Sequence, residues 1–346
     1  MEKYIHAFNL LENLGPVKIK RVIDSYPNAK SAWEAQNSQI NADEEWKKIP
    51  QDIKVISYNH HLYPEKLKEI YAPPVLLYCR GNMDLLNRLS VAVVGSRKIS
   101  EYGIQSTKLI CRPLARAGVV IVSGLALGVD GLSHETALEL NGPTIAVLGS
   151  GINDFVIYPY QNRSLAQKII NNNGLVLSEY PPQEKAAIHY FPARNRIISG
   201  LSSATIIIEA QKRSGALITA FKALEQNRDV FAVPGSIFSP NSQGTNYLIK
   251  KGAQPLISGQ DIIDELQLDL NVDNSSNNSC RNYSLDEQSI LKNITEEAIH
   301  IDKIIKITRL KPAVVIPILT QLEIEEVIFN LGNNRYVINN TQNIKK

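Results

Sequence analysis

The chain has 346 residues, of which 44% are hydrophobic, so it is long enough for two or three domains that each bury a core. Three scattered cysteines without a CxxC pair, and histidines without ligand spacing, argue against a disulfide scaffold and a metal site. The net charge of +3 is small, no apolar run reaches the ~20 residues of a membrane span, and Met1–Leu10 is no apolar leader, so we expect a cytoplasmic protein without membrane contact.

Residues 1–70 are predicted to form a helical domain. Leu10–Leu14 leads through Gly15-Pro16 into a second helix, Val17–Ile23. Two helices joined by such a turn resemble a helix-hairpin-helix, whose turn amides can bind a backbone phosphate. A purely structural helical bundle fits the same pattern. A connector with Tyr63-Pro64 and Pro73-Pro74 follows.

Residues 71–270 are predicted to form an α/β domain with a doubly wound parallel sheet. Short runs rich in Val and Ile alternate with amphipathic stretches such as Ile104–Ala117 and Ser133–Leu140. Strands buried on both faces have this composition, and the alternation indicates β-α-β units. The predicted strands are Val91–Val94, Val119–Val122, Thr144–Leu148, Leu175–Leu177, Thr205–Glu209 and Val230–Val233.

Residues 271–283 are predicted to be a linker, because Asn271–Ser279 is polar and of low complexity. Residues 284–346 have the element order of a winged helix, three helices and a hairpin. Pro317 is expected to kink or shorten the third helix. The expected helices are Ser284–Asn293, Ile299–Thr308 and Lys311–Leu322, and the expected hairpin strands are Val327–Phe329 and Tyr336–Ile338.

The loops after the predicted strands are rich in Gly and Ser. Ligands of a doubly wound sheet bind beyond the carboxyl ends of its strands, and Gly lets backbone amides approach an anion closely. The loops therefore predict a phosphate-lined pocket. The residues that we expect to contribute from these loops are Gly95, Ser96, Arg97, Gly149, Ser150, Gly151, Ser214 and Gly215.

The segment Phe191–Ser199 adds the side chains that could hold a nucleic acid. Arg194 and Arg196 flank Asn195, and Phe191 lies just upstream. Arginine forks match phosphate oxygens, and an aromatic face can stack a base. This combination indicates single-stranded nucleic acid. Arg196 could instead be a buried, paired arginine.

Enzymatic alternatives are less well supported by the sequence. Gly149-Ser150-Gly151 lacks the third glycine of a dinucleotide-binding loop, and Ser123 stands where an acidic residue would hold a ribose. Asp130 and His134 are better explained as a loop anchor and a buried imidazole. We expect no catalytic set and no cofactor. A nucleotide or phosphoribosyl hydrolase that uses Asp130 or Glu209 remains the alternative, as does a nucleoid protein without strand preference.

Taken together, the motifs of the middle domain resemble the DNA-processing protein A family (DprA/Smf). The resemblance rests on several separate motifs. These are Gly95-Ser96-Arg97, Ser123–Ala126, Asp130, His134, Thr144–Gly149, Tyr158-Pro159, Ser178-Glu179, Phe191–Leu201, Glu209-Ala210, Ser214–Ala220, Ala223–Gln226, Ala232–Gly235 and Gly244–Asn246.

The resemblance implies a Rossmann-like domain between a helical domain and a winged-helix tail. It also implies a non-catalytic protein that binds single-stranded DNA, protects it in natural transformation, helps to load the RecA recombinase and forms a homodimer. In this chain Tyr160 and Ile188 stand where family members often carry lysine. Two missing cations would weaken a binding energy dominated by phosphates.

An apolar stretch near the end of the middle domain is expected to contribute to the homodimer, with inward packing in a monomer as the alternative. It comprises Leu256, Ile257, Ile262, Ile263, Leu266 and Leu268.

Overall fold

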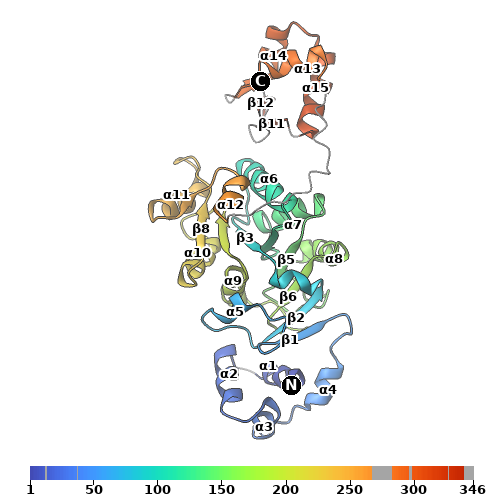
Figure 1. Ribbon diagram of the computed structural model, residues 1–346, viewed down its shortest axis with the longest axis vertical. Helices are drawn as coiled ribbons and strands as arrows, with labels where there is room; N and C mark the ends of the chain where they lie inside the picture. Colours follow the sequence, from blue (N-terminus) through green and yellow to red (C-terminus); the bar gives the residue numbers. More distant parts are fainter. Residues whose placement is uncertain (12–13, 37, 267–282, 296–297, 326, 339–346) are drawn as a thin grey trace. The chain divides into compact units, whose positions relative to one another are not determined.

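The computed structural model describes residues 1–346 except 12–13, 37, 267–282, 296–297, 326 and 339–346 (Figure 1). The chain divides into two compact units, Met1–Leu270 and Asn271–Lys346. The expected linker lies largely outside the described residues, as do Leu268 and Cys280. No helix of the described part is long and apolar enough to cross a membrane.

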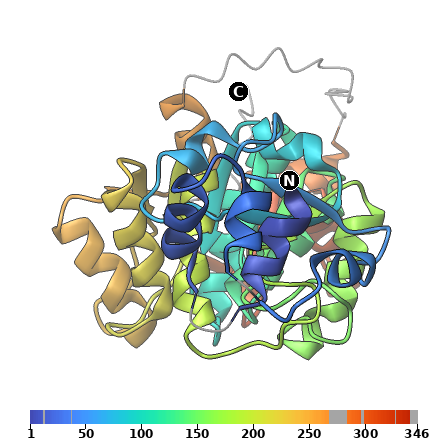
Figure 2. The same cartoon turned by 90° about the horizontal axis from the view of Figure 1, so that it is seen from below.

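The first unit begins with four short helices, in blue in Figures 1 and 2. They are α1 (Glu2–Asn9), α2 (Pro16–Asp24), α3 (Ala29–Glu34) and α4 (Ala42–Lys47). Phe8 and Trp33 are buried against each other, with ring centroids 5.0 Å apart. Asn28 and Asn41 cap α3 and α4 through their side chains, as expected for short polar residues at helix starts.

A nine-stranded sheet forms the centre of this unit, in the order β1-β2-β6-β5-β4-β3-β7-β8-β9. The strands from β6 to β9 along this order are parallel, whereas β2 is antiparallel to both β6 and β1. The six predicted strands correspond to β3–β8, and the doubly wound parallel sheet is confirmed. The strands are β1 (Lys54–Ser57), β2 (Leu76–Gly81), β3 (Ser90–Val94), β4 (Val120–Ser123), β5 (Thr144–Val147), β6 (Leu175–Ser178), β7 (Ala204–Ile207), β8 (Asp229–Ala232) and β9 (Gln254–Pro255).

Three strands of this sheet were not predicted from the sequence: β1, β2 and β9. Because β1 pairs with β2, the segment 1–70 is not helical throughout, and the sheet takes in residues before position 71. The short helix α5 (Glu65–Lys68) also lies between these two strands along the chain.

Helices cover both faces of the sheet. Alternate side chains of β3 divide between two cores, because successive residues of a strand point to opposite faces. Val91 and Val93 pack with α6 and α12, and Ala92 and Val94 pack with α9 and α10. The helices and 3-10 turns that follow β2 in this unit are η1 (Met83–Asn87), α6 (Glu101–Arg116), α7 (Val129–Glu139), η2 (Tyr160–Asn162), α8 (Arg163–Asn171), α9 (Tyr190–Leu201), α10 (Gly215–Glu225), η3 (Pro240–Ser242), α11 (Gln243–Lys250) and α12 (Gly259–Glu265).

The apolar stretch expected at a dimer contact is mostly internal. Leu256, Ile262 and Ile263 are buried in the core with α6, and Leu266 packs against that core. Of the described members, only Ile257 is strongly exposed, at 70%. The stretch therefore closes the first unit and does not offer the apolar surface that we expected.

The second unit has a core of its own and contains the three expected helices and the expected hairpin, together with a strand, β10, that was not predicted and that occupies the start of the second expected helix. Its members are α13 (Leu285–Leu291), β10 (Ile299–His300), α14 (Ile301–Thr308), α15 (Pro312–Ile324), β11 (Ile328–Asn330) and β12 (Arg335–Ile338), with the three strands forming one antiparallel sheet. Ile304, Val315, Leu319 and Leu322 are buried in this core. The expectation that Pro317 shortens the third helix is wrong, because α15 continues to Ile324.

Candidate functional site

A cavity of about 570 Å³ opens where β3 and β7 end, and we call it the strand-end cavity. Gly95 and Arg97 follow β3, Ser214 and Gly215 lie at the start of α10, and the first turns of α9 complete the lining. Parallel strands bring their carboxyl ends to one edge, which is why loops distant in sequence meet here. The residues that line it are Val94, Gly95, Ser96, Arg97, Lys98, Ala126, Asp130, Tyr158, Ile188, Phe191, Pro192, Arg194, Asn195, Ile198, Gln211, Arg213, Ser214, Gly215, Ala216, Ile218 and Thr219.

The loop after β3 is shaped by its glycine and serine. A Cβ on Gly95 would lie 2.6 Å from Cγ2 of Val129, so only glycine lets α7 pack this closely. The Ser96 hydroxyl donates to the carbonyl of Lys98 at 2.9 Å and accepts from the Lys98 amide at 3.2 Å. These bonds fix a tight turn that leaves Arg97 exposed at the mouth of the cavity.

Arg97 lies beside an aromatic ring and is a candidate for binding a phosphate. Its guanidinium carbon lies 5.5 Å from the centroid of the Phe191 ring, and that ring lies 5.5 Å from the ring of Tyr158. Within the described residues, Arg97 forms no ion pair with a carboxylate. Its charge is therefore available to a ligand, beside an aromatic face that can stack a base.

Arg194 lies deeper and is already engaged. It is 3% exposed and donates from Nη1 to the carbonyls of Gly124, at 2.8 Å, and Val147. Burial lowers the pKa of Arg194 to about 10, and neighbouring Asp130 opposes this shift. Arg194 thus stays charged at neutral pH and forms a positive floor, with little capacity left to grip a phosphate.

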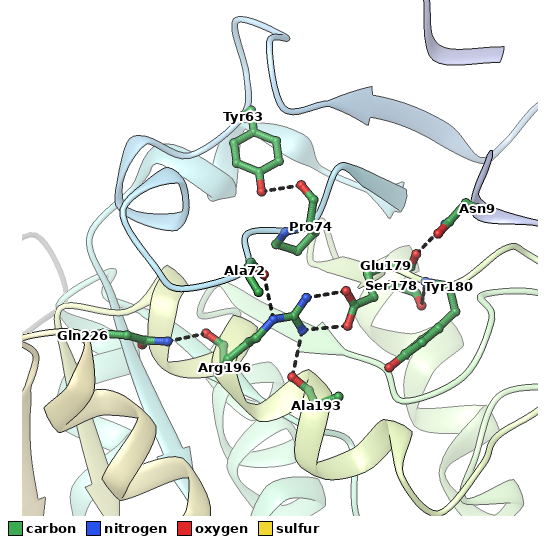
Figure 3. A network of polar contacts seen from close by, with 10 residues as sticks. All are labelled: Asn9, Tyr63, Ala72, Pro74, Ser178, Glu179, Tyr180, Ala193, Arg196 and Gln226. Atoms are coloured by element: carbon green, nitrogen blue, oxygen red, sulfur yellow. Dashed lines mark hydrogen bonds and ion pairs between the residues drawn. The ribbon is translucent and has the colours of Figure 1, made fainter. Parts of the chain in front are cut away.

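Arg196 points away from the strand-end cavity and does not line it, which corrects its expected place beside Arg194. Its guanidinium is bidentate to Glu179, at 2.7 and 2.6 Å, and Nε donates to the carbonyl of Ala72 at 2.9 Å (Figure 3). A further bond runs to the carbonyl of Ala193 at 2.8 Å. Arg196 is therefore a buried, paired arginine, which was the alternative considered from the sequence.

The loop Gly149-Ser150-Gly151 is also absent from the lining, contrary to expectation. The Gly151 amide donates to the carbonyl of Glu184 at 2.7 Å and so has no bond left for a phosphate. Gly149 supports the cavity indirectly, because a Cβ there would lie 2.7 Å from Cδ1 of Phe191. The small residue makes room for the ring.

The start of α10 forms another part of the lining. Ser214 caps this helix by accepting from the Ala216 amide at 3.2 Å, and Asn195 Nδ2 donates to the carbonyl of Gly215 at 3.4 Å. A helix N-terminus carries partial positive charge and favours an anion. Ser214, Gly215 and Asn195 are thus brought together with Arg97 as expected.

Two further cations, Lys98 and Arg213, line the cavity and were missed from the sequence. Both are exposed, and neither forms an ion pair within the described part of the chain. Their positions directly after β3 and directly before Ser214 were the available signal. They offset in part the absence of lysine at Tyr160 and Ile188.

The acidic residues considered for catalysis are held by backbone and side-chain donors. Asp130 is 6% exposed and accepts from the Gly124 amide at 3.1 Å, and burial raises its pKa. Glu209 is 1% exposed and accepts from the Ser100 amide at 3.0 Å. Burial lowers the pKa of His134 to about 3, and its Nδ1 lies 2.7 Å from the Thr144 hydroxyl oxygen. These contacts suit structural anchors. The described residues contain no cluster of three metal-binding side chains.

Comparison with known proteins gives two family matches. The model of "DNA recombination-mediator protein A" matches residues 54–267, and that of the "DprA winged helix domain" matches residues 279–334. The DNA processing protein DprA of Streptococcus pneumoniae is 50% identical over 205 residues, which cover 59% of this chain and 71% of the relative. Protein Smf of Escherichia coli is 41% identical over 260 residues, covering 70% and 68%.

Two solved structures are similar in fold and sequence. The crystal structure of DprA from Streptococcus pneumoniae has a TM-score of 0.63 at 41% identity, over 76% of this chain and 91% of that one. DNA processing protein A from Helicobacter pylori has a TM-score of 0.56 at 35% identity, over 62% and 95%. The latter structure concerns the single-stranded DNA binding mode of that protein.

Proposed function

Because the chain belongs to the DNA recombination-mediator protein A family, we propose that it binds single-stranded DNA in the strand-end cavity. In this role it protects an incoming strand during natural transformation and passes it to the RecA recombinase in the cytoplasm. Support comes from the relative in Helicobacter pylori, whose structure concerns binding of single-stranded DNA.

The observation that carries the proposal is Arg97 beside Phe191. An exposed guanidinium without an acidic partner favours a phosphate, and the adjacent ring favours an unstacked base. Lys98 and Arg213 add positive charge to the same lining. Bases of a duplex are stacked on each other, so a ring that stacks a base favours a single strand.

Titration of labelled single-stranded and duplex DNA over a series of salt concentrations tests the proposal. We expect preference for the single strand, with log affinity falling linearly against log salt by about 0.7 per phosphate contact. Equal affinity for duplex would favour a nucleoid protein instead. Release of base or phosphate from nucleoside monophosphates would favour the hydrolase.

The delivery of DNA to RecA is a separate part of the proposal. It is supported by the description of the family as a recombination mediator. We expect the chain to shorten the lag before RecA forms filaments on DNA already coated with a single-strand-binding protein. The Arg97→Ala variant, with weakened DNA binding, should shorten this lag less. An unchanged lag with the wild-type chain would contradict the mediator role.

We also propose a homodimer of the first unit, supported by exposed apolar residues around α11. Ile237 is 78% exposed, Phe238 90% and Tyr247 46%. Large apolar side chains exposed together often mark an interaction surface. Sedimentation at micromolar concentration should show a dimer, and Phe238→Glu should shift it toward monomer. Only monomer in the wild-type chain would contradict the pairing.

A further inference from the structure

A second concave surface lies outside the strand-end cavity, and we call it the N-terminal groove. It has a volume of about 470 Å³ and runs between α2 and residues 71–73 of the connector. The Gly15-Pro16 turn at the start of α2 was noted in the sequence as a possible phosphate-binding turn, and it does not line the strand-end cavity. Its lining has the chemistry of a ligand site.

The groove carries one unneutralised cation. Lys20 lies 2.8 Å from the carboxylate of Asp24, and its ammonium lies 4.9 Å from the ring centroid of Tyr58. Arg21 is exposed, and within the described residues its side chain forms neither a hydrogen bond nor an ion pair. The positive charge of the groove therefore resides on a free guanidinium, which binds phosphate oxygens well.

Tyr71 supplies a planar face beside this cation. It lines the groove and is 84% exposed, although covering a large aromatic side chain lowers the free energy of the system. Base stacking on an aromatic ring covers such a face irrespective of the base. An acidic peptide would pair with Arg21, but a nucleic acid supplies both a phosphate for Arg21 and a planar base for Tyr71 in every nucleotide. The two residues together favour a single-stranded nucleic acid.

The groove and the strand-end cavity are joined by one short helical segment. Ala72 lines the groove, and its carbonyl accepts from Arg196 Nε at 2.9 Å (Figure 3). Arg194 lies two residues earlier on α9, a rise of ~3 Å, and lines the strand-end cavity. One turn of α9 thus contacts the connector beside the groove through Arg196 and lines the strand-end cavity with Arg194, so a strand long enough to pass around this turn can reach both surfaces.

We propose that the N-terminal groove is a second contact for the same single strand, in which Arg21 binds a phosphate and Tyr71 stacks a base. The proposal rests on the proposed function of the strand-end cavity. It makes the affinity depend on the length of the strand, since a short oligonucleotide fills only one of the two surfaces.

The test compares two lengths of oligothymidine, about 6 and about 30 nucleotides, with the full chain and single variants. Tyr71→Ala should lower the affinity for the long strand at least about fivefold and leave that for the short strand unchanged. Arg21→Ala should have the same selectivity and reduce the salt slope for the long strand by about 0.7. Tyr71→Phe, which keeps the ring, should retain wild-type binding. Lys47→Ala, which removes an exposed cation of α4 outside the groove, serves as the control.

Four outcomes are distinguishable. Selective loss on the long strand, restored in Tyr71→Phe, supports the second contact. Unchanged binding of both lengths by Tyr71→Ala and Arg21→Ala overturns it and leaves the groove to another partner, such as a peptide. Equal loss on both lengths also overturns it, because the residues would then support the fold. A wild-type chain that binds neither length contradicts the proposed function itself.

Discussion

Arg97 and Arg194 line the same cavity, yet their guanidinium groups are in opposite situations. Arg97 is exposed and rests on an aromatic ring, whereas Arg194 is buried and donates to two carbonyls. A donor that is already hydrogen-bonded inside the fold acts on a ligand through its electrostatic potential and not through a direct contact. Binding should therefore depend on the two residues in different ways.

Replacing Arg97 with Ala should lower the affinity for single-stranded DNA roughly tenfold, because one charge-assisted contact is lost. The slope of log affinity against log salt should shrink by about 0.7. Fluorescence anisotropy over a salt series measures both quantities. Lys168→Ala removes an exposed cation of α8, outside the lining, and should change neither. Loss of affinity at a constant slope would show that Arg97 is structural.

The Arg196–Glu179 pair should contribute to stability and not to the salt slope. The side chains of Arg196 and Glu179 are 11% and 8% exposed. Breaking a buried pair leaves an uncompensated charge, so Arg196→Met should lower the free energy of unfolding by about 3 kcal/mol or more. The double variant Arg196→Met, Glu179→Leu should recover part of that loss. Urea titration gives these values, and a changed salt slope in a folded variant would contradict the assignment.

Acid should destabilise the fold through buried histidines. Burial lowers the pKa of His6 to about 4, below its ordinary value of 6.5, and its Nδ1 lies 2.7 Å from the hydroxyl oxygen of Tyr78. Between these pH values the unfolded chain binds a proton that the folded chain does not, so the free energy of unfolding falls as pH decreases. His6→Gln should reduce that fall by up to about 1.4 kcal/mol per pH unit. Equal pH dependence of both proteins would contradict this role.

Eight of the twelve site residues predicted from residue type and loop position line the strand-end cavity. Gly95, Ser96 and Arg97 follow a strand whose Val-rich composition is plain in the sequence, and Ser214 caps a helix as its type favours. The sequence does not show which polar groups already form hydrogen bonds within the fold. The Gly151 amide is bonded to the carbonyl of Glu184, a partner set by the path of a loop 33 residues along.

At the scale of elements, the helical state of α9 explains why two arginines so close in sequence differ. Residues two positions apart on an α-helix are separated by roughly 200° around its axis. Arg194 therefore faces the strand-end cavity while Arg196 faces the connector and Glu179. The pattern Arg-Asn-Arg alone does not state whether it is helix or loop, and the roles of its arginines depend on that difference.

The edge of the sheet was missed for a related reason. The strand β2 is buried along most of its length, but its partner β1 is short and antiparallel, and both precede the regular alternation of strands and helices. Composition predicts the buried parallel strands well because both faces require Val, Ile or Leu. A four-residue edge strand such as β1 carries no such signal.

The helix α15 should not read DNA sequence. The exposed residues of its first turns include Val314 and Ile316, at 36% and 51%, whereas a major-groove reader offers Arg, Asn or Gln to base edges. Its exposed Gln321 lies near the other end and donates to Glu325 Oε1 at 3.0 Å. Exposed cations on α14, Lys303 and Lys306, can contact phosphates without reading bases. We expect the segment 284–346, which has its own core, to show no sequence preference in selection from a duplex library. An enriched sequence motif would contradict this.

At the scale of the whole chain, all residues that line the strand-end cavity and the N-terminal groove belong to the first unit. Each unit has its own hydrophobic core, so removal of the second should leave the first folded. The binding free energies of sites without shared contacts are close to additive. Deletion of residues 271–346 should therefore leave both the affinity for single-stranded DNA and its salt slope unchanged.

The deletion of residues 271–346 also separates DNA binding from other functions of the second unit. Adding Arg97→Ala to the shortened chain should lower its affinity by the same factor as in the full chain, since the cavity is intact in both. Anisotropy titration at one salt concentration measures this ratio. If the shortened chain lost most of its affinity while its thermal unfolding stayed cooperative, the tail would have to contact the strand directly. The cavity at the ends of β3 and β7 would then be only part of the DNA site.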